Sequence, residues 1–257
     1  MKSRNTGKNR IADRLPAILL ALALLAAWQV AAMSIGQASI LPAPTDILVR
    51  IWELRESLFL EHLPTTLETV AAGWGLAILV GVLLAVLMHF SPHAEAMLYP
   101  AMSVTQTVPV MCISPLFVLW LGYTLGARLL AVVLSTFFAI ALNTFDGLGS
   151  VDPAKEEWLR TCGAGKKEIF FHLAVPTALP RLMTALKMTF PWAVIDAAVA
   201  EWLGATDGLG YFSKRMVSKL DGAGVFAPVV ILCLVSLVGM AVLNLVDRKW
   251  VTWRNEV

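Results

Sequence analysis

Long uncharged stretches dominate the pattern of hydrophobic and polar positions along this chain. A helix needs roughly 20 predominantly apolar residues to cross the hydrocarbon core of a bilayer, within a working range of about 17–25. Five stretches without Asp, Glu, Lys or Arg reach this length, the fourth only just. They predict membrane-spanning helices at 16–35, 68–89, 98–121, 127–146 and 227–246.

A sixth apolar stretch, at 180–203, is interrupted by Lys187, Asp196 and Glu201. We interpret it as the fifth of six spans. The predicted fold class is therefore an all-α polytopic membrane protein with six transmembrane helices. A basic start before an apolar run also occurs in secretory signal peptides, whose apolar region has 7–15 residues. Because the first run is longer, we expect an uncleaved helix.

The composition supports a membrane protein and excludes several other classes. Of the 257 residues, 58% are hydrophobic and 15% are charged, whereas soluble domains carry roughly 25% charged residues. This hydrophobicity excludes intrinsic disorder, and three scattered cysteines are too few for a disulfide scaffold. The net charge of +2 argues against a nucleic-acid partner. The expected partner is the lipid bilayer.

Lys and Arg are distributed unequally between the two sides of the predicted membrane domain. Six spans place the N-terminal tail, the 147–180 loop with its edge and the C-terminal tail on one side, with thirteen basic residues against six. Because cytoplasmic flanks carry the excess of Lys and Arg, we expect both termini and this loop in the cytoplasm. The predicted organisation is a tail at 1–15, a membrane domain at 16–247 and a tail at 248–257.

Small residues recur every four positions in the second predicted span, at Gly73, Ala77, Gly81 and Ala85. This spacing places them on one helix face, where a neighbouring backbone can approach closely. Packing inside one subunit and a contact between two subunits both account for this ladder, so the sequence leaves both open.

The third predicted span contains Gln106, Thr107, Pro109, Ser114 and Pro115. Each proline removes a backbone donor and disturbs the preceding turn, and unsatisfied backbone cannot face lipid. Two explanations stay open. Either a broken helix lines a wet substrate pathway, or neighbouring helices repair a proline kink.

The ionisable residues of the fifth span differ in depth. Lys187 lies near the cytoplasmic end and is expected to snorkel, whereas Glu201 lies close to the opposite interface, where water would solvate it. Asp196 is the deepest, and charges at such depth usually face a cavity or a partner. With Asn143 at the cytoplasmic mouth, the predicted translocation pathway comprises Gln106, Thr107, Pro109, Ser114, Asn143, Asp196 and Glu201.

The 147–180 loop contains two predicted short helices. Asp152 is a good N-cap before Pro153, and the first helix would end near Cys162, where Gly163 provides a left-handed cap. A second, amphipathic piece from Lys166 to Ala174 would end at Pro176. Its exposed phenylalanines and lysines predict a docking surface, with a helix on the lipid surface as the alternative.

The same residues carry a family resemblance. The loop reads Glu157-Trp158-Leu159, three residues, Gly163, nine residues, then Leu173-Ala174-Val175-Pro176. It resembles the E-A-A-x3-G-x9-I-x-L-P coupling loop of bacterial ABC importer permeases, with Trp and Leu in place of two alanines. The resemblance implies a type I importer permease fold in the inner membrane, in which this loop docks on a cytoplasmic ATPase. The residues expected at that contact are Glu157, Gly163, Ala164, Phe170, Phe171 and Pro176.

Further stretches resemble the nitrate, sulfonate and taurine branch of this family. They are Ile40–Pro44, His62–Leu67, Ser114–Gly122, Gln106–Pro109, Ala200–Ala205 and Gly208–Tyr211, of which the last three look most like permeases for thiamine pyrimidine precursors. The resemblance implies a dimer of ATPase subunits, a second permease copy and an extracytoplasmic binding protein as partners. Because no cation is placed clearly at mid-membrane, we expect a thiamine pyrimidine precursor as substrate, with alkyl sulfonate, taurine or nitrate as alternatives.

Motifs of intramembrane enzymes do not occur in the sequence. It contains neither the H-E-x-x-H of metalloproteases nor a G-x-S-G, and no carboxylate completes a metal set with His89 and His93. A phosphate loop fails because Lys167 replaces the required Ser or Thr and Arg160 replaces the first glycine. We expect no catalytic site, metal or cofactor here, with ATP and Mg bound by the partner ATPase. A channel or proton-coupled carrier stays open on composition alone.

Overall fold

The computed structural model describes residues 10–252, with side chains from residue 15 onward. This part of the chain contains helices and connecting turns and no strand, which confirms the all-α fold class. The α-helices are α1 (Arg10–Ile35), α2 (Pro44–Glu53), α3 (Leu63–Phe90), α4 (Pro92–Thr105), α5 (Val110–Leu121), α6 (Leu125–Leu148), α7 (Pro153–Thr161), α8 (Lys166–Ile169), α9 (Val175–Gly204), α10 (Leu209–Ser218) and α11 (Gly222–Trp250). Two π-helical segments, η1 (Ser57–His62) and η2 (Phe170–Ala174), lead into α3 and α9.

Five helical stretches are long and apolar enough to cross a membrane. The predicted spans at 16–35, 68–89, 127–146, 180–203 and 227–246 lie within α1, α3, α6, α9 and α11, so the interrupted fifth span is helical throughout. The expected basic tails at 1–9 and 253–257 lie outside the described residues.

The third predicted span is not one continuous helix. α4 and α5 meet at an angle of 97°, with the break at residues 106–109. Pro109 precedes the first residue of α5 and has an extended backbone. Because proline has no N–H and disfavours a helical conformation in the residue before it, α4 ends before this point. The structure therefore has the broken helix that the sequence left as one of two explanations.

The ladder of small residues on α3 packs within the subunit. All four residues are buried. A Cβ on Gly73 would lie 2.8 Å from Cβ of Val132, and one on Gly81 would lie 2.9 Å from the carbonyl oxygen of Phe137. These positions allow α3 and α6 to approach closely, and the ladder is thus part of the core rather than a contact between subunits.

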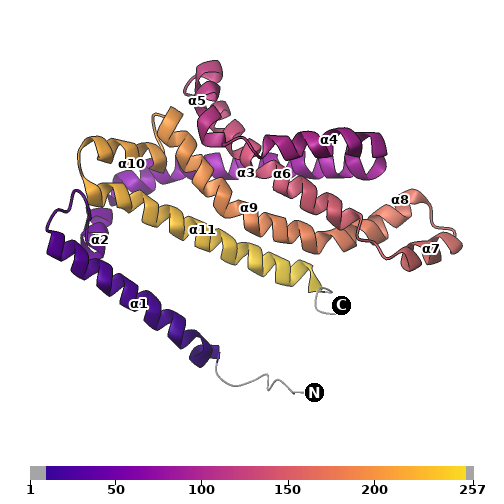
Figure 1. Ribbon diagram of the computed structural model, residues 1–257, viewed down its shortest axis with the longest axis horizontal. Helices are drawn as coiled ribbons and strands as arrows, with labels where there is room; N and C mark the ends of the chain where they lie inside the picture. The colour runs from indigo at the N-terminus through magenta and orange to yellow at the C-terminus, as the bar shows by residue number, and fades with distance from the viewer. Residues whose placement is uncertain (1–9, 253–257) are drawn as a thin grey trace.

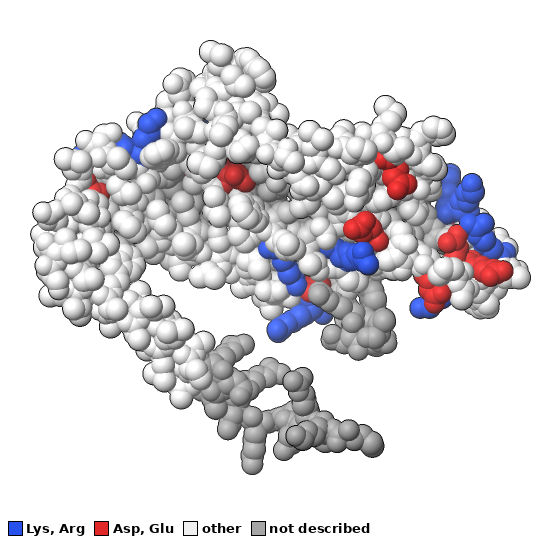
Figure 2. All heavy atoms as spheres, viewed as in Figure 1, with Lys and Arg blue, Asp and Glu red and all other residues white. Residues whose placement is uncertain are grey.

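The long helices run side by side with distinct structures at the two ends (Figure 1). α2 and α10 lie at one end, where Arg50 of α2 is paired with Asp221 at 2.6 Å. α7 and α8 project at the opposite end, and α11 runs from the α10 end toward that side of the molecule. Figure 2 shows charged side chains gathered toward the α7–α8 end, with a largely uncharged middle. This arrangement suits a bilayer across the middle of the bundle.

Candidate coupling loop and polar pathway residues

α7 forms as its sequence predicts. The Asp152 carboxylate accepts a hydrogen bond from the backbone N–H of Ala154 at 3.0 Å, and Pro153 occupies the first helical position. Arg160 pairs with Glu156 at 2.5 Å along one side of the helix. No residue of α7 is buried, and Trp158 and Glu157 are exposed. α7 therefore presents most of its surface outward.

Gly163 ends this helix in the left-handed conformation, with φ +89°. The N–H of Gly163 donates to the carbonyl of Arg160, and that of Ala164 donates to the carbonyl of Leu159, both at 3.0 Å. The second bond spans five residues, as in a Schellman cap. No heavy atom lies within 4 Å of a Cβ built on Gly163. Backbone conformation alone, without local crowding, therefore favours glycine at this position.

The second piece of the loop does not end at Pro176, contrary to the sequence prediction. α8 continues through η2 directly into α9, and residues 166–204 form one helical stretch. Pro176 lies in the first turn of α9, where a missing N–H is tolerated. The loop is therefore joined to the fifth span by uninterrupted helix.

The two adjacent phenylalanines differ in exposure, so the expectation that both are exposed is wrong for one of them. Phe171 is 64% exposed, whereas Phe170 is 8% exposed. The Phe170 ring lies 4.8 Å from that of Phe90 and 5.6 Å from that of His89, both at the end of α3. Phe170 also packs with Leu148 at the end of α6. It thus connects the loop to two membrane helices.

A pocket of about 450 Å³ separates the loop helices from the ends of the membrane helices. It is lined by both loop and bundle residues, including His89, Phe90, Leu148, Glu156, Arg160 and Phe170. The aromatic cluster of Phe170, Phe90 and His89 thus borders this pocket.

The polar residues predicted for the pathway are dispersed. Gln106, Thr107 and Pro109 are exposed at the break between α4 and α5. Ser114 is buried and donates to the carbonyl of Val110 at 2.8 Å. Asn143 is half-buried near the end of α6, where its amide donates to the carbonyl of Ala139 at 2.8 Å. These residues do not form one polar cluster.

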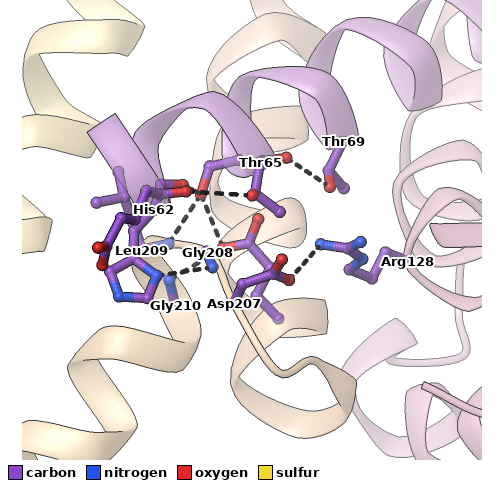
Figure 3. A network of polar contacts seen from close by, with 11 residues as sticks. His62, Thr65, Thr69, Arg128, Asp207, Gly208, Leu209 and Gly210 are labelled. Atoms are coloured by element: carbon purple, nitrogen blue, oxygen red, sulfur yellow. Dashed lines mark hydrogen bonds and ion pairs between the residues drawn. The ribbon is translucent and has the colours of Figure 1, made fainter. Parts of the chain in front are cut away.

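Glu201 is fully buried in a hydrogen-bonded network, so the expectation that water solvates it is wrong. Its carboxylate accepts hydrogen bonds from the Thr66 hydroxyl at 2.9 Å and from the backbone N–H of Gly210 at 3.0 Å. Thr66 in turn accepts from the N–H of Leu209 at 2.9 Å, and His62 Nδ1 accepts from the N–H of Gly208 at 3.1 Å (Figure 3). The network therefore connects η1 and α3 with α9 and the start of α10.

Sequence reasoning missed the roles of His62, Thr66 and the Gly208–Gly210 turn in this network. The available signal was the Gly-Leu-Gly sequence, because two glycines so close together indicate a backbone conformation or a close approach that side chains would prevent. Gly208 has φ +102°, and a Cβ there would meet the Glu201 carboxylate. The partner helix of the turn was not evident from sequence.

Two basic side chains of the described membrane helices lie within ion-pair distance of carboxylates. Lys187 Nζ lies 2.5 Å from Asp247 Oδ2, which joins α9 to α11. The expectation that Lys187 snorkels is therefore wrong, because a carboxylate on the neighbouring helix is within reach. Arg128 Nη1 lies 3.6 Å from Asp207 Oδ1 beside the Glu201 network (Figure 3).

Asp196 is half-buried on α9 and has a different environment. The Ser135 hydroxyl of α6 interacts with its carboxylate and is also placed to donate to the carbonyl of Val132 at 3.0 Å. The Oδ2 atom is shielded from solvent and has no hydrogen-bond partner among the described residues. Asp196 thus retains an unused acceptor within a span.

Long apolar helices, a broken third span and a projecting pair of loop helices define a polytopic membrane permease. A solved amino acid ABC transporter chain has the same fold, with a TM-score of 0.59 and 20% identity over 73% of this chain and 91% of that one. The chain belongs to the family of binding-protein-dependent transport system inner membrane components, which matches residues 77–252. It is a permease subunit of an ABC importer.

Two relatives of known name have sequences similar to this chain. The chain is 44% identical to the formylaminopyrimidine transport permease protein of Halalkalibacterium halodurans, over 93% of this chain and 95% of the relative. It is 30% identical to a putative aliphatic sulfonates transport permease protein of Bacillus subtilis, over 93% and 87%. Both are named as transport permeases, in agreement with the expectation of a subunit that conducts substrate rather than an enzyme.

Proposed function

We propose that this chain forms the translocation pathway of an importer in the bacterial inner membrane and is driven by a separate cytoplasmic ATPase that binds ATP and Mg. Residues 147–180 dock on that ATPase, both termini lie in the cytoplasm, and an extracytoplasmic binding protein delivers the substrate to the opposite end. The exposed aromatic side chains of the loop support this assignment, because Trp158 of α7 is 66% exposed and Phe171 of η2 is 64% exposed in the described chain. Exposed aromatic side chains of this kind suit a protein interface.

We further propose a small aminopyrimidine, of the class named for the 44% identical relative, as the substrate. The identity to that relative, which extends over 93% of this chain, carries this choice. Lys187 is hydrogen-bonded to Asp247, and Arg128 lies 3.6 Å from the Asp207 carboxylate. Neither of these two cations is without a nearby carboxylate, so neither is free to bind an anionic sulfonate. A neutral heteroaromatic ring needs no such cation.

Uptake by the reconstituted importer tests this substrate. The permease, its ATPase and its binding protein would be placed in liposomes, and ATP-dependent accumulation of labelled formylaminopyrimidine and of labelled aliphatic sulfonate compared. We expect accumulation of the pyrimidine and none of the sulfonate. Sulfonate uptake without pyrimidine uptake would contradict the assignment. Growth of a deletion strain on a pyrimidine precursor of thiamine provides the matching test in cells.

We propose that two copies of this chain assemble in the importer. The small-residue ladder of α3 cannot provide the contact, since it packs on α6 within one subunit. Co-expression of two differently tagged copies with the ATPase tests the assembly. We expect each tag to co-purify the other copy. Recovery of one tag only, together with a second kind of permease subunit, would indicate a heterodimer instead.

A further inference from the structure

The pocket of about 450 Å³ between the loop helices and the bundle has the size of a ligand site, since pockets that bind small molecules have volumes of about 300–1,000 Å³. Its lining comes from α3, α6, α7, α8 and η2. It lies at the α7–α8 end of the molecule, where charged side chains gather (Figure 2). This position favours a water-soluble ligand.

Two cations line this pocket, and one of them has no carboxylate partner. Lys166 forms no ion pair and no side-chain hydrogen bond among the described residues. Arg160 donates to Oε1 of Glu156 through Nε at 3.2 Å and through Nη2 at 2.5 Å. The two N–H donors on its Nη1 are unused within the described part of the chain. Glu156 is the one carboxylate among the lining residues, so the lining carries a net positive charge.

Aromatic side chains form another wall of the same pocket. The Phe170 ring lies 4.8 Å from that of Phe90 and 5.6 Å from that of His89, and all three residues line the pocket. Because Phe90 is 55% exposed, its ring is only partly covered by the described chain. A further aromatic ring can therefore pack against it.

The cations and the aromatic wall together select a class of ligand. A phosphate group accepts charge-assisted hydrogen bonds from lysine and arginine, whereas a planar ring stacks on aromatic side chains. A neutral aminopyrimidine makes no use of the cations, and inorganic phosphate makes no use of the rings. A single aromatic ring that bears a phosphate uses both.

We propose that this pocket is a regulatory site for a soluble aromatic phosphate, with the phosphate bound by Lys166 and Arg160 and the ring packed on Phe90 and Phe170. Arg160 belongs to α7 and Lys166 to α8, on either side of Gly163, and Phe90 belongs to α3. The bound molecule therefore connects both loop helices to a membrane helix. A ligand that binds one arrangement of the loop shifts the protein toward that arrangement, which slows a transport cycle in which the loop must move. Binding itself is independent of the proposed function, and only the effect on uptake rests on it.

Binding of phenyl phosphate to the full-length chain in nanodiscs of neutral phosphatidylcholine tests the site. We expect it to bind about 10-fold more tightly than inorganic phosphate, which lacks the ring, and more tightly than benzyl alcohol, which lacks the phosphate. Lys166→Gln should weaken binding of phenyl phosphate by about 10- to 100-fold, as for loss of a hydrogen bond to a charged group. The matched control is Lys167→Gln, because Lys167 is an adjacent exposed lysine that does not line the pocket. This variant should bind phenyl phosphate like the wild type.

The ring contact is tested by a second matched pair of variants. Phe90→Leu keeps apolar volume and removes the ring, and should lower the affinity for phenyl phosphate to that for inorganic phosphate. Phe171→Leu removes an exposed ring that does not line the pocket, and should leave the affinity unchanged. Wild-type affinity for phenyl phosphate in either Lys166→Gln or Phe90→Leu would overturn the site.

An anionic lipid headgroup is the other source of a phosphate at this end of the bundle. Nanodiscs in which phosphatidylglycerol replaces part of the phosphatidylcholine separate the two sources, and we expect the affinity for phenyl phosphate to change equally in the wild type and in Lys166→Gln. A loss of affinity in the wild type that is absent in Lys166→Gln would mean that a lipid headgroup occupies the pocket. It would overturn the assignment to a soluble ligand.

Uptake by the complete importer in liposomes tests the regulatory role. Phenyl phosphate on the side of the ATPase should lower ATP-dependent uptake by the wild type and by Lys167→Gln, each compared with its own rate without the probe, and should have little effect on Lys166→Gln. Equal inhibition of all three would place the effect on the ATPase and overturn the regulatory role. Binding that depends on Lys166, in an importer that takes up neither pyrimidine nor sulfonate, would support the site and overturn the proposed function.

Discussion

At the scale of single residues, three consecutive backbone N–H groups at the start of α10 are bound by side chains of other helices. Gly208 donates to His62, Leu209 to Thr66 and Gly210 to Glu201. The first N–H groups of a helix have no partner within the helix itself. The network therefore satisfies them and at the same time fixes α10 to α3 and α9.

Replacement of Gly208 tests this arrangement. Gly208→Ala forces a side chain into a positive φ, which costs about 1–2 kcal/mol, and also places a methyl group against the Glu201 carboxylate. We expect the thermal unfolding temperature of the detergent-solubilised protein to fall. The control is Gly75→Ala in α3, where nothing lies within 4 Å of the added Cβ, and which should be neutral or slightly stabilising. Equal falls of the unfolding temperature for Gly208→Ala and Gly75→Ala would contradict the stabilising role of the Glu201 network.

Gly163 is the residue of the coupling loop whose backbone is most restrictive. Gly163→Val should cost about 1–2 kcal/mol locally and displace α7 relative to α8. This cost comes from the backbone conformation alone, because nothing lies within 4 Å of an added Cβ. We expect the protein to remain in the membrane while co-purification of the ATPase and substrate uptake both fall. Gly149→Val, in the same loop at φ −82°, serves as the control. Full co-purification and uptake in Gly163→Val would exclude the docking role.

At the scale of elements, local sequence signals predicted what depends on local structure. Asp152-Pro153 and Gly163 mark both ends of α7, because a capping side chain and a left-handed glycine act within a few residues of their own positions. The continuation of helix through Pro176, the burial of Phe170 and the pairing of Lys187 with Asp247 depend on neighbours distant in sequence. The hydrophobic pattern of a single segment cannot predict contacts with residues so distant in sequence.

The carboxylates of α9 also show the difference between local sequence signals and contacts with distant residues. The polar positions of α9 are evident from sequence, but their roles differ by environment. Glu201 is enclosed by Thr66 and the Gly208–Gly210 turn, whereas Asp196 is half-buried and interacts with Ser135 of α6. Only the packing of α3 and α6 around α9 distinguishes the environments of these two carboxylates.

The connection between α8 and the bundle leads to a prediction for adjacent residues. Phe170→Ala removes a buried ring that contacts Phe90 and Leu148, so we expect the ATPase still to co-purify while uptake falls and hydrolysis no longer responds to the binding protein. Phe171→Ala changes an exposed ring and should weaken co-purification instead. Phe170→Leu, which keeps apolar volume, should restore part of the uptake. The same phenotype for Phe170→Ala and Phe171→Ala would contradict this division of roles.

At the scale of the whole molecule, the path of the chain links the two ends of the bundle. α11 ends toward the side that carries α7 and α8 (Figure 1). The loop between α1 and α2 lies at the other end beside the α10–α11 turn, where Gly222 closely approaches the backbone of Ser39. If the excess of Lys and Arg marks the cytoplasm, residues 153–169 and the end of α11 lie there and Ser39 lies outside.

Cysteine labelling tests this orientation directly, because Cys162 is already exposed at the end of α7. In a background with Cys112→Ser and Cys233→Ser, a membrane-impermeant maleimide should label Cys162 in inverted vesicles and not in intact cells. Ser39→Cys, placed in the same background with Cys162→Ser, should give the reverse pattern, since Ser39 is exposed at the opposite end. Labelling of Cys162 in intact cells would place the coupling loop outside, where no ATP-hydrolysing subunit could dock.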